Sequence, residues 1–529
     1  MRPAGAAFRA CRLLPPHGFK TDMLTTTVHS TTPAPHPGAT LEQVRRRVSP
    51  RYAAPAGIAW PALLIHGTLT LLWLVLFLRA FLPDGLWSWT AGLVYILYDT
   101  ALLVFVFVQT LPLLGRGADA APHPGTRAHG VEPATQRPSL AVVVAAHDEE
   151  AVLAATLRAL LDQTEPPERI VVADDGSGQR TLALLSREFA LGTPLVGHLG
   201  APSLPHPTLG WLRLPHGGKA AALNRAVQML DHELVVTVDA DTLLDRDAIR
   251  AMRDAFARNP RLVAATGVLL PVCDGSLGGR LFEWFQTYEY LRNFLSRYAW
   301  SRMDSLLLIS GAFAGYRRQA LVEVGGFDAD CLVEDYELIH RLKRYGAIEG
   351  LDWTTAVLGS ARARTEAPAT LGAFLRQRRR WFGGFLQTQT WYRDMIGNSR
   401  YGRLGLFMLP VKAADTLQPV YGLTAAALLI GDLVTGHGGV ALAITGVIAA
   451  KIALDLCFHL WSVMVFRRWL GVTARTSLPS AVLASLVEPF CFQILRHLGA
   501  ASGWIVYLTG RSSWGRQTRG GLAASAEER

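Results

Sequence analysis

Two carboxylates one residue apart, Asp239 and Asp241, follow a short apolar run at residues 234–238. Such a run is typical of a buried strand. In open α/β sheets, ligands bind at the carboxyl ends of the strands. Paired acids at that position suit a hard divalent cation that keeps water and substrate phosphates as its other ligands. A single Asp-x-Asp is also typical of an acidic turn, so the rest of the chain has to decide between the two interpretations.

Other acids stand at comparable positions. Asp174 and Asp175 end the apolar run 170–173, and Glu334 and Asp335 follow a glycine-rich turn. Each pair alone has an ordinary explanation, since Asp-Gly-Ser is a common turn and acids at the start of a helix complement its dipole. Acids at successive strand ends of one domain instead favour a common site.

The segments around these acids alternate between strand and helix patterns. Residues 140–146 are rich in valine and alanine, as in a buried strand, and residues 149–163 place their leucines on one helix face. This alternation predicts an α/β fold with a doubly wound, mostly parallel sheet.

The chain has 529 residues, half of them apolar, with a net charge of +10 and a pI of about 9.6. The apolar residues are concentrated in four long runs, 58–82, 86–114, 404–433 and 440–466. Each run exceeds the roughly 20 residues that a membrane-spanning helix needs. Much of the excess arginine flanks these runs, which favours a membrane over nucleic acid as the basic chain's partner.

The distribution of arginine also predicts the orientation. Arginines precede the first run and follow the second and the fourth, so the positive-inside rule places these segments in the cytoplasm. The last apolar stretch, 478–510, contains Glu488, Pro489 and Arg496, and is compatible with one span, a re-entrant hairpin or an interfacial helix. We therefore expect a multi-pass protein of the cell (inner or plasma) membrane with a cytoplasmic α/β domain.

The predicted organisation has six parts. They are a disordered segment (1–55), a transmembrane hairpin (56–115), a linker (116–138), the α/β domain (139–400), a group of transmembrane or interfacial helices (401–510) and a cytoplasmic tail (511–529).

The order of the acidic motifs resembles that of the membrane-embedded family 2 glycosyltransferases, which include cellulose, hyaluronan, chitin-oligosaccharide and poly-N-acetylglucosamine synthases. The family pattern D, D-x-D, E/T-D and Q-x-x-R-W stands here as Asp174-Asp175, Asp239-Ala240-Asp241, Glu334-Asp335 and Gln377-Arg378-Arg379-Arg380-Trp381. Residues 218–224 resemble the family's Gly-Lys-Ala-x-Ala-Leu-Asn. Asp148 departs from the family, which usually has Asn there. The resemblance covers about residues 139–390.

The resemblance implies a GT-A-like fold and a UDP-sugar donor whose leaving group is a diphosphate. A Mg²⁺ or Mn²⁺ held by Asp241 and Asp239 could neutralise the charge that grows there. The resemblance places Asp174 or Asp175 at the uridine. Lys219 opens a stretch with a helical pattern, so its ammonium and the helix N-terminus can both approach the nucleotide or its phosphates; the alternative is a surface lysine.

The acceptor sugar hydroxyl is a poor nucleophile, and a carboxylate within about 3 Å must take its proton. We expect Asp335 to be this base, with Glu334 beside it, in a single displacement with inversion. The alternative is that both acids only mark a helix start.

Gln377, Arg380 and Trp381 have the i, i+3, i+4 spacing that places three side chains on one helix face. Arg380 can pair with diphosphate oxygens, and Trp381 offers an apolar face to a pyranose ring. The other basic residues of this run are compatible with an anionic-lipid patch at the membrane surface: Arg376, Arg378 and Arg379.

Charged residues inside the apolar runs are costly in lipid. Lys412 and Asp415, and Lys451 and Asp455, are spaced to pair along one helix. These residues fit a polar, polymer-conducting path as well as they fit simple intrahelical pairs.

These features and the resemblance together predict an inverting membrane glycosyltransferase that extends a β-linked polysaccharide processively and feeds it outward. The similarity in size and layout to the family favours N-acetylglucosamine as the sugar. The alternatives are single glycosyl transfer to a lipid acceptor and, in another class, a non-catalytic transporter or scaffold. The expected partners are the UDP-sugar, a polysaccharide or lipid acceptor and membrane lipids, without nucleic acid; an accessory export or regulatory subunit is left open.

Overall fold

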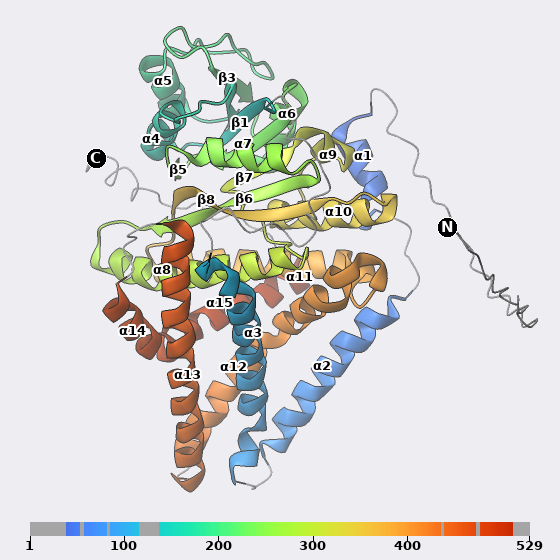
Figure 1. Cartoon of the computed structure of the whole chain (residues 1–529), viewed down its shortest axis with the longest axis vertical. Helices are drawn as coiled ribbons and strands as arrows, with labels where there is room; N and C mark the ends of the chain where they lie inside the picture. The colour runs from blue at the N-terminus through green and yellow to red at the C-terminus, as the bar shows by residue number, and fades with distance from the viewer. Residues whose placement is uncertain are drawn as a thin grey trace, which may run out of the picture. The chain divides into compact units, whose positions relative to one another are not determined.

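The predicted strands at 140–146 and 234–238 lie side by side at the centre of one sheet in the computed structural model (Figure 1). The structure describes residues 39–52, 58–81, 85–115, 137–434, 438–471 and 477–510. Within them, the sheet has the strand order β3-β2-β1-β4-β7-β6-β8-β5. Its strands are β1 (Leu140–Ala146), β2 (Arg169–Asp175), β3 (Leu209–Leu214), β4 (Leu234–Asp239), β5 (Thr242–Leu244), β6 (Leu262–Val272), β7 (Phe313–Arg317) and β8 (Thr354–Glu366).

The two halves of the sheet differ in strand direction. Strands β3, β2, β1 and β4 are all parallel, as predicted. On the other side of β4, the pairs β4–β7, β7–β6 and β8–β5 are antiparallel, and only β6–β8 is parallel. The sheet is therefore mixed, with a parallel half that resembles a doubly wound fold.

The register of the parallel half brings the predicted acids together. Ala146 at the end of β1 pairs with Asp174 on one side, and Ala145 pairs with Asp239 on the other. The carboxyl ends of β2 and β4 thus flank the same end of β1, because parallel strands in register end at the same edge.

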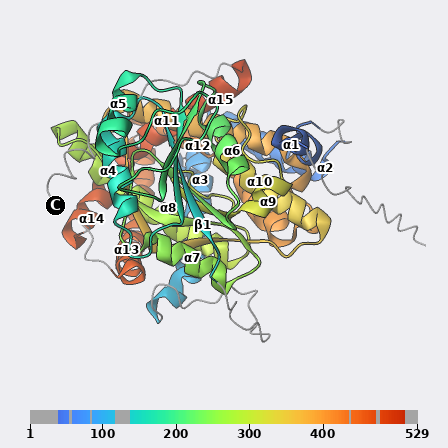
Figure 2. The same ribbon diagram turned by 90° about the horizontal axis from the view of Figure 1, so that it is seen from above.

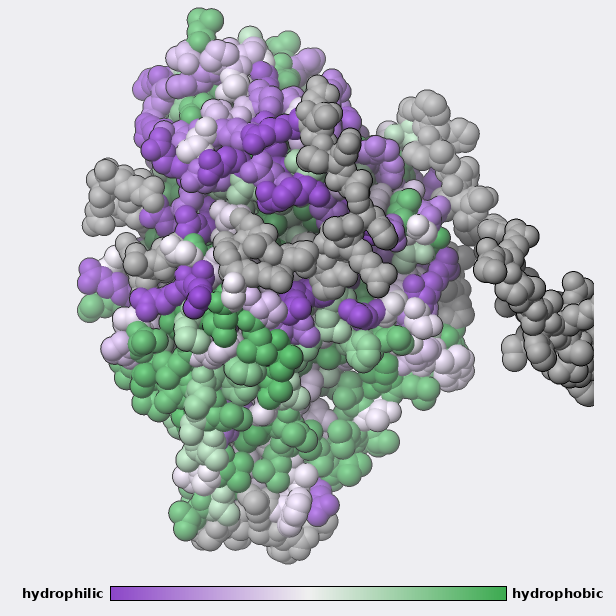
Figure 3. Space-filling model, viewed as in Figure 1, coloured by the Kyte–Doolittle hydropathy of each residue, from purple (hydrophilic) through white to green (hydrophobic). Residues whose placement is uncertain are grey.

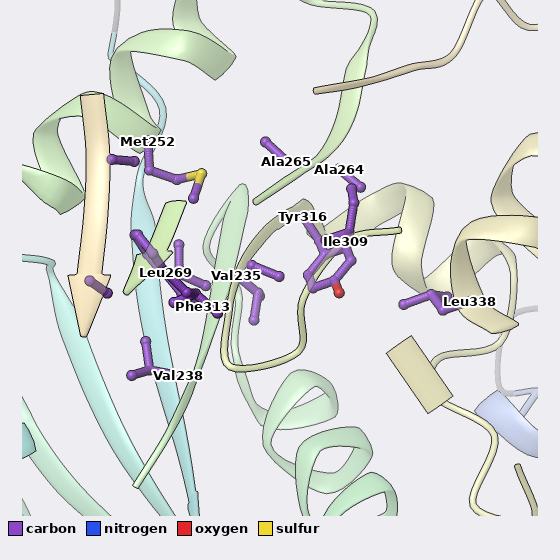
Figure 4. Packing of buried hydrophobic residues seen from close by; sticks show 14 of the residues in the cluster. Val235, Val238, Met252, Ala264, Ala265, Leu269, Ile309, Phe313, Tyr316 and Leu338 are labelled. Atoms are coloured by element: carbon purple, nitrogen blue, oxygen red, sulfur yellow. The ribbon is translucent and has the colours of Figure 1, made fainter. Parts of the chain in front are cut away.

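Helices cover the faces of this sheet (Figures 1 and 2). They are α4 (Glu150–Leu161), α5 (Gln179–Glu188), α6 (Lys219–Met229), α7 (Ala248–Arg258), α9 (Arg318–Glu323) and α10 (Glu334–Glu349). Figure 4 shows how buried residues of different elements meet, among them Met252 of α7, Phe313 of β7 and Leu338 of α10. A Cβ at Gly315 of β7 would lie 2.7 Å from the Met252 sulfur, so glycine is what lets α7 pack against the strand.

In the described part of the chain, four helical segments are long and apolar enough to cross a membrane: Trp60–Arg79, Trp87–Leu114, Leu404–Val434 and Leu442–Leu470. They contain α2 (Trp60–Arg79), α3 (Thr90–Thr110), α12 (Leu409–Val434) and α13 (Gly438–Leu470), with the short turns η1 (Gly85–Trp89), η2 (Leu111–Leu114) and η5 (Leu404–Met408). All four predicted runs are confirmed as helices of this length. Figure 3 shows that these helices carry hydrophobic side chains on the face in view, whereas the region of the sheet is hydrophilic.

The last apolar stretch is bent. Helices α14 (Leu478–Val487) and α15 (Phe492–Thr509) meet at an angle of 50° across the short turn η6 (Glu488–Phe490). The bend is compatible with one broken span and with a re-entrant hairpin; the interfacial helix stays a prediction.

Two long helices join the sheet to the apolar helices (Figure 1). They are α8 (Leu277–Arg302) and α11 (Leu371–Trp391), which the short turns η3 (Arg393–Met395) and η4 (Ser399–Tyr401) connect to η5. Glu289 of α8 is 2.7 Å from Arg378 of α11 and 3.2 Å from Arg496 of α15. Arg292 of α8 is 2.5 Å from Glu488. Ion pairs therefore connect α8 to α11, to α15 and to the turn η6.

The charged residues of the apolar helices pair with one another. Lys451 of α13 lies 2.7 Å from Asp99 of α3 and also contacts Asp455. Lys412 lies 2.7 Å from Asp415. The pairing interpretation is therefore the one that the contacts support, and the Lys451–Asp99 pair extends it from within one helix to between two.

The prediction of disorder for residues 1–55 needs a correction. Residues 41–48 form the helix α1 (Leu41–Val48), which begins with a capping box between Thr40 and Gln43. The helix is formed because Leu41 and Val44 recur on one face and are buried against the rest of the protein. Residues 1–38 and 53–57, the linker 116–136 and the tail 511–529 lie outside the described residues.

Candidate functional site

At the carboxyl end of β2, two aspartates hold the backbone of the adjacent loops in place. Asp174 is fully buried, and its carboxylate accepts the N–H of Ser177 at 2.9 Å and the Trp211 indole N–H at 3.2 Å. Asp175 accepts the N–H groups of Gly217 at 2.7 Å and of Gly218 at 2.9 Å. Asp174 therefore holds the turn, and Asp175 fixes the backbone that leads into Lys219.

Two histidines that the sequence analysis did not select stand beside Asp175. Their Nδ1 atoms lie 2.8 Å (His147) and 3.1 Å (His216) from the Asp175 carbonyl oxygen, and their rings stack at 4.4 Å. Because a carbonyl can only accept, each Nδ1 donates to it, and the Nδ1 of His216 also lies 2.9 Å from an Asp175 carboxylate oxygen. Among the described residues, these histidines and Asp175 form a group that could hold a metal ion, with ligand atoms within 4.8 Å of one another.

Lys219 connects two of the predicted acidic pairs. It is the first residue of α6, and its ammonium lies 2.5 Å from Asp239 Oδ1 and 3.6 Å from Glu334 Oε1. Burial lowers the pKa of the lysine, but the attraction of Asp239 and Glu334 outweighs it and holds the pKa above its ordinary value. The alternative of a surface lysine is therefore excluded.

Asp241 adds a buried carboxylate to this edge. Burial, together with the negative charges of Asp239 and Glu366, raises its pKa to about 8. Glu366 is brought close by β8, since its N–H donates to the Asp241 carbonyl at 3.1 Å. Carboxylate oxygens are the ligands that Mg²⁺ and Mn²⁺ prefer, and Glu366 stands close enough to Asp241 to raise its pKa. Among the described residues, however, these three carboxylates do not gather within ligand distance of one another as the His147, Asp175 and His216 group does, so a cation at Asp239 and Asp241 stays a prediction.

The candidate base lies at the start of α10. One Asp335 oxygen accepts the N–H of Gly311 at 2.7 Å and the other that of Tyr336 at 2.8 Å, and the side chain is partly exposed. A Cβ at Gly311 would lie only 3.0 Å from the carboxylate. Glu334 is buried, and burial is the main cause that raises its pKa. Asp335, which is fixed and accessible, is the better placed of the two to meet a substrate.

The predicted helix face of α11 is present, but its residues have different environments. Gln377 is buried, and its Oε1 has no hydrogen-bond partner among the described residues. Arg380 donates to the Leu332 carbonyl at 3.3 Å, just before Glu334. Trp381 lies under the guanidinium of Arg378, 4.6 Å from its ring centre. Gln377 thus offers an unused acceptor oxygen, and Arg380 links α11 to the start of α10.

Arg378 does not belong to a lipid patch, contrary to one of the alternatives. It is buried and pairs with Glu289 at 2.7 Å. Its neighbour Arg376 is exposed, and Arg379 is partly so. The lipid-patch interpretation therefore stays open only for these two, because an arginine paired inside the protein cannot meet lipid.

Arg297 of α8 is a second residue that the sequence analysis missed. Burial lowers its pKa to about 10, against the opposing influence of Tyr290 and Asp335. Its Nε and Nη1 atoms are buried without a hydrogen-bond partner in the described part of the chain. It is a cation with unused donors within electrostatic reach of Asp335. No motif marks it, since a single arginine within a long helix forms no recognisable pattern.

Comparisons with known proteins agree with this geometry. Residues 141–325 match the family described as Glycosyl transferase family 2, and residues 234–487 match Glycosyl transferase family group 2. Poly-beta-1,6-N-acetyl-D-glucosamine synthases of Staphylococcus epidermidis and of Staphylococcus aureus strain COL are each 26% identical, over 289 and 281 residues. In both cases the match covers 53% of this chain and 62% of the relative.

The fold has a counterpart among solved structures. The mannosyltransferase PcManGT from Pyrobaculum calidifontis, in complex with GDP-Man and Mn²⁺, superposes with a TM-score of 0.50 at 20% identity. The match covers 77% of this chain and 99% of that one. The mixed sheet is thus of the GT-A-like type.

Proposed function

From the premise that this chain carries glycosyltransferase family 2 domains, we propose that it is an inverting membrane glycosyltransferase that transfers a sugar from a UDP-sugar to a growing β-linked polysaccharide. The observation that carries the proposal is the contact of one ammonium, Lys219, with both Asp239 and Glu334. This contact joins the acids expected at the diphosphate to those expected at the acceptor.

The donor occupies the parallel half of the sheet. Asp175 and the loop that it fixes at Gly217 and Gly218 face the uridine, and Lys219 attracts the diphosphate. Asp239, Asp241 and Glu366 would hold Mg²⁺ or Mn²⁺, which when bound neutralises the charge that develops on the leaving diphosphate. Without an anion nearby, the ammonium of Lys219 stays with Asp239, so that charge at this edge remains partly balanced.

The acceptor approaches Asp335. The hydroxyl oxygen of the acceptor bonds to the anomeric carbon of the donor sugar, while the bond from that carbon to the diphosphate oxygen breaks. The hydroxyl proton passes to the Asp335 carboxylate. The products are the extended sugar chain with inverted configuration and UDP. The N–H groups of Gly311 and Tyr336 hold the carboxylate in place during this step.

Residues of α11 complete the site. The unpaired Gln377 Oε1 can accept a hydrogen bond from a sugar hydroxyl, and burial makes such a bond valuable because the atom has no alternative partner. Arg380 stands by the diphosphate as a charge-assisted donor. Trp381 offers its ring to a pyranose, although its other face already meets Arg378.

The sugar and the acceptor are further parts of the proposal. N-acetylglucosamine is supported by relatives that are named for a β-1,6-N-acetylglucosamine polymer, although the match spans 62% of their length. The four apolar helices support extension at a membrane and delivery across it. A single transfer to a lipid acceptor is the second candidate, because the same helices give lipid substrates access to the site.

Purified full-length protein in lipid nanodiscs, supplied with a panel of labelled UDP-sugars, with GDP-mannose and with lipid extract, tests the proposal. We expect a high-molecular-weight product from UDP-N-acetylglucosamine. A single labelled glycolipid would favour lipid transfer, and label incorporation from GDP-mannose alone would overturn the donor. Absence of transfer from every donor would leave a transporter or scaffold.

A further inference from the structure

The segment before the first apolar helix is anchored to the sheet domain. We call residues 39–52 the strap; it contains α1, which lies beside α9 and α10 (Figures 1 and 2). Leu41 and Val44 are buried, and Arg45 of the same helix is only 8% exposed, whereas Arg46 and Arg47 are exposed. Burying an arginine is costly unless its donors are used, so Arg45 has a specific partner.

That partner is the backbone of the loop at residues 325–330. Arg45 Nη1 donates to the carbonyl of Phe327 at 2.9 Å and to that of Gly325 at 3.2 Å. Gly325 has a φ of +83°, and a Cβ there would lie 2.3 Å from the Arg45 backbone nitrogen. The strap and the loop therefore touch at a distance that only glycine allows.

A second arginine of the strap reaches two elements at once. Arg51 lies 3.2 Å from the buried carboxylate of Asp328 and 3.1 Å from Asp330. Its guanidinium also lies over the ring of Trp391, 4.6 Å from the centre. Trp391 ends α11, so this side chain joins the loop to the helix that carries Gln377, Arg380 and Trp381.

The other side of the loop is held by the helices of the site. Asn224 of α6 donates to the same Phe327 carbonyl at 2.8 Å and accepts the Phe327 N–H at 2.7 Å. Arg341 of α10 donates to the Gly326 carbonyl at 2.7 Å. Both lone pairs of the Phe327 carbonyl are thus in use, one toward the strap and one toward the helix that begins at Lys219.

The loop leads directly to the candidate base. Leu332 lies between the loop and α10, which begins with Glu334 and Asp335. The Leu332 carbonyl accepts a hydrogen bond from the Arg380 guanidinium. A displacement of the loop would therefore move the base and Arg380 relative to Lys219 and Asp239. Rate is sensitive to such displacements, since about 1 Å can cost on the order of a hundredfold.

We propose that the strap is a positioning element of the transferase, in which Arg45 fixes the 325–330 loop and thereby the position of Asp335 and Arg380 relative to Lys219 and Asp239. The proposal rests on the proposed function for its catalytic consequence. It makes the segment next to the first apolar helix a part of the acceptor side of the site.

The test compares Arg45→Ala with Arg46→Ala, a matched change of an exposed arginine on the same helix. Hydrogen exchange of residues 325–335 and UDP affinity are measured on the full-length protein in nanodiscs, and kcat is measured well below the unfolding temperature. For Arg45→Ala we expect faster exchange, a kcat lowered about tenfold and a UDP affinity changed less than twofold. Arg46→Ala should resemble the wild type in all three.

The Gly325→Ala variant disrupts the same contact between the loop and Arg45 by a change in the loop. It should reproduce the lower kcat, and in the double variant with Arg45→Ala the two losses should not multiply, because both break one interaction. Unchanged exchange in Arg45→Ala would overturn the contact itself. Faster exchange and a lower unfolding temperature with an unchanged kcat would show a purely structural role. If the wild type transfers no sugar, the exchange result still decides on the contact, while the proposed function fails separately.

Discussion

The donor side and the acceptor side of the site are built in different ways. On the donor side, Asp174, Asp175 and Asp239 stand at the ends of neighbouring parallel strands, and Lys219 begins the helix that follows. On the proposed acceptor side, Asp335 is held by the N–H groups of Gly311 and Tyr336, and the strap is proposed to act on it through the 325–330 loop. The donor side is therefore defined by local strand–turn–helix units, whereas the acceptor side depends on contacts between residues far apart in the sequence.

This difference leads to a kinetic expectation. Changes to the donor side should alter the binding of UDP-sugar and cation, whereas changes to the acceptor side should alter kcat and leave UDP affinity intact. Four variants test this distinction, and each has a control that separates a site effect from a loss of folding.

The largest effect is expected for Asp335→Asn, which keeps the shape of the side chain but removes the base. The kcat for transfer from labelled UDP-sugar should fall about 10³-fold, while UDP titrated calorimetrically binds as before. Asp352→Asn, an exposed acid outside the site, is the control. A variant with near-normal turnover would remove Asp335 from the mechanism.

The next effect concerns the cation. EDTA should abolish transfer, and addition of Mn²⁺ should restore it. The Asp241→Asn variant should lower kcat/KM on the order of a hundredfold, because the charge on the leaving diphosphate is no longer neutralised. Direct Mn²⁺ binding should weaken in Asp241→Asn and stay normal in His147→Gln. The opposite pattern would move the metal to the histidine pair beside Asp175.

A smaller effect is expected for Arg297→Gln on the acceptor side. It removes the cation near Asp335 and its two unused buried donors, and kcat should fall about tenfold, which is about 1.4 kcal/mol of transition-state stabilisation. Arg280→Gln changes an exposed arginine of the same helix and should leave kcat unchanged. An altered UDP affinity in Arg297→Gln would contradict the division of the site into two sides.

The smallest effect is expected for His216→Ala on the donor side. Loss of the ring beside Asp175 removes a surface on which a nucleobase can stack, so KM for the donor should rise about fivefold at constant kcat. His198→Ala, an exposed histidine elsewhere, serves as the comparison. A fall in kcat with an unchanged KM would assign His216 to the other side of the site.

The same division explains what the sequence could predict. The ends of β1, β2 and β4 and the start of α6 were predictable, because buried strands and their turns leave a local pattern. The four long apolar helices were equally clear from length and composition. The antiparallel strands β7 and β5 were not, since their neighbours are chosen by contacts distant in sequence.

The residues that were missed follow the same rule. Arg297 comes within reach of Asp335 only through the packing of α8, and Glu366 comes beside Asp241 only through β8; no local spacing records either approach. The disorder predicted for the strap came from its composition, while its order comes from the pocket that the 325–330 loop offers to Arg45. Arg378 stands inside a recognisable motif, yet its partner Glu289 could be found only in three dimensions.

The ion pairs and aromatic contacts between α8, α11 and α15 have a consequence for how the chain can be divided. Phe285, Phe374 and Phe492 pack together from these three helices, which the pairs of Glu289 with Arg378 and Arg496 also connect. Residues 139–400 cut out alone would present this aromatic cluster and an incompletely paired carboxylate to water. The boundary drawn from hydropathy therefore runs through a shared interior of α8, α11 and α15, and we expect residues 139–400 to be soluble only together with α15.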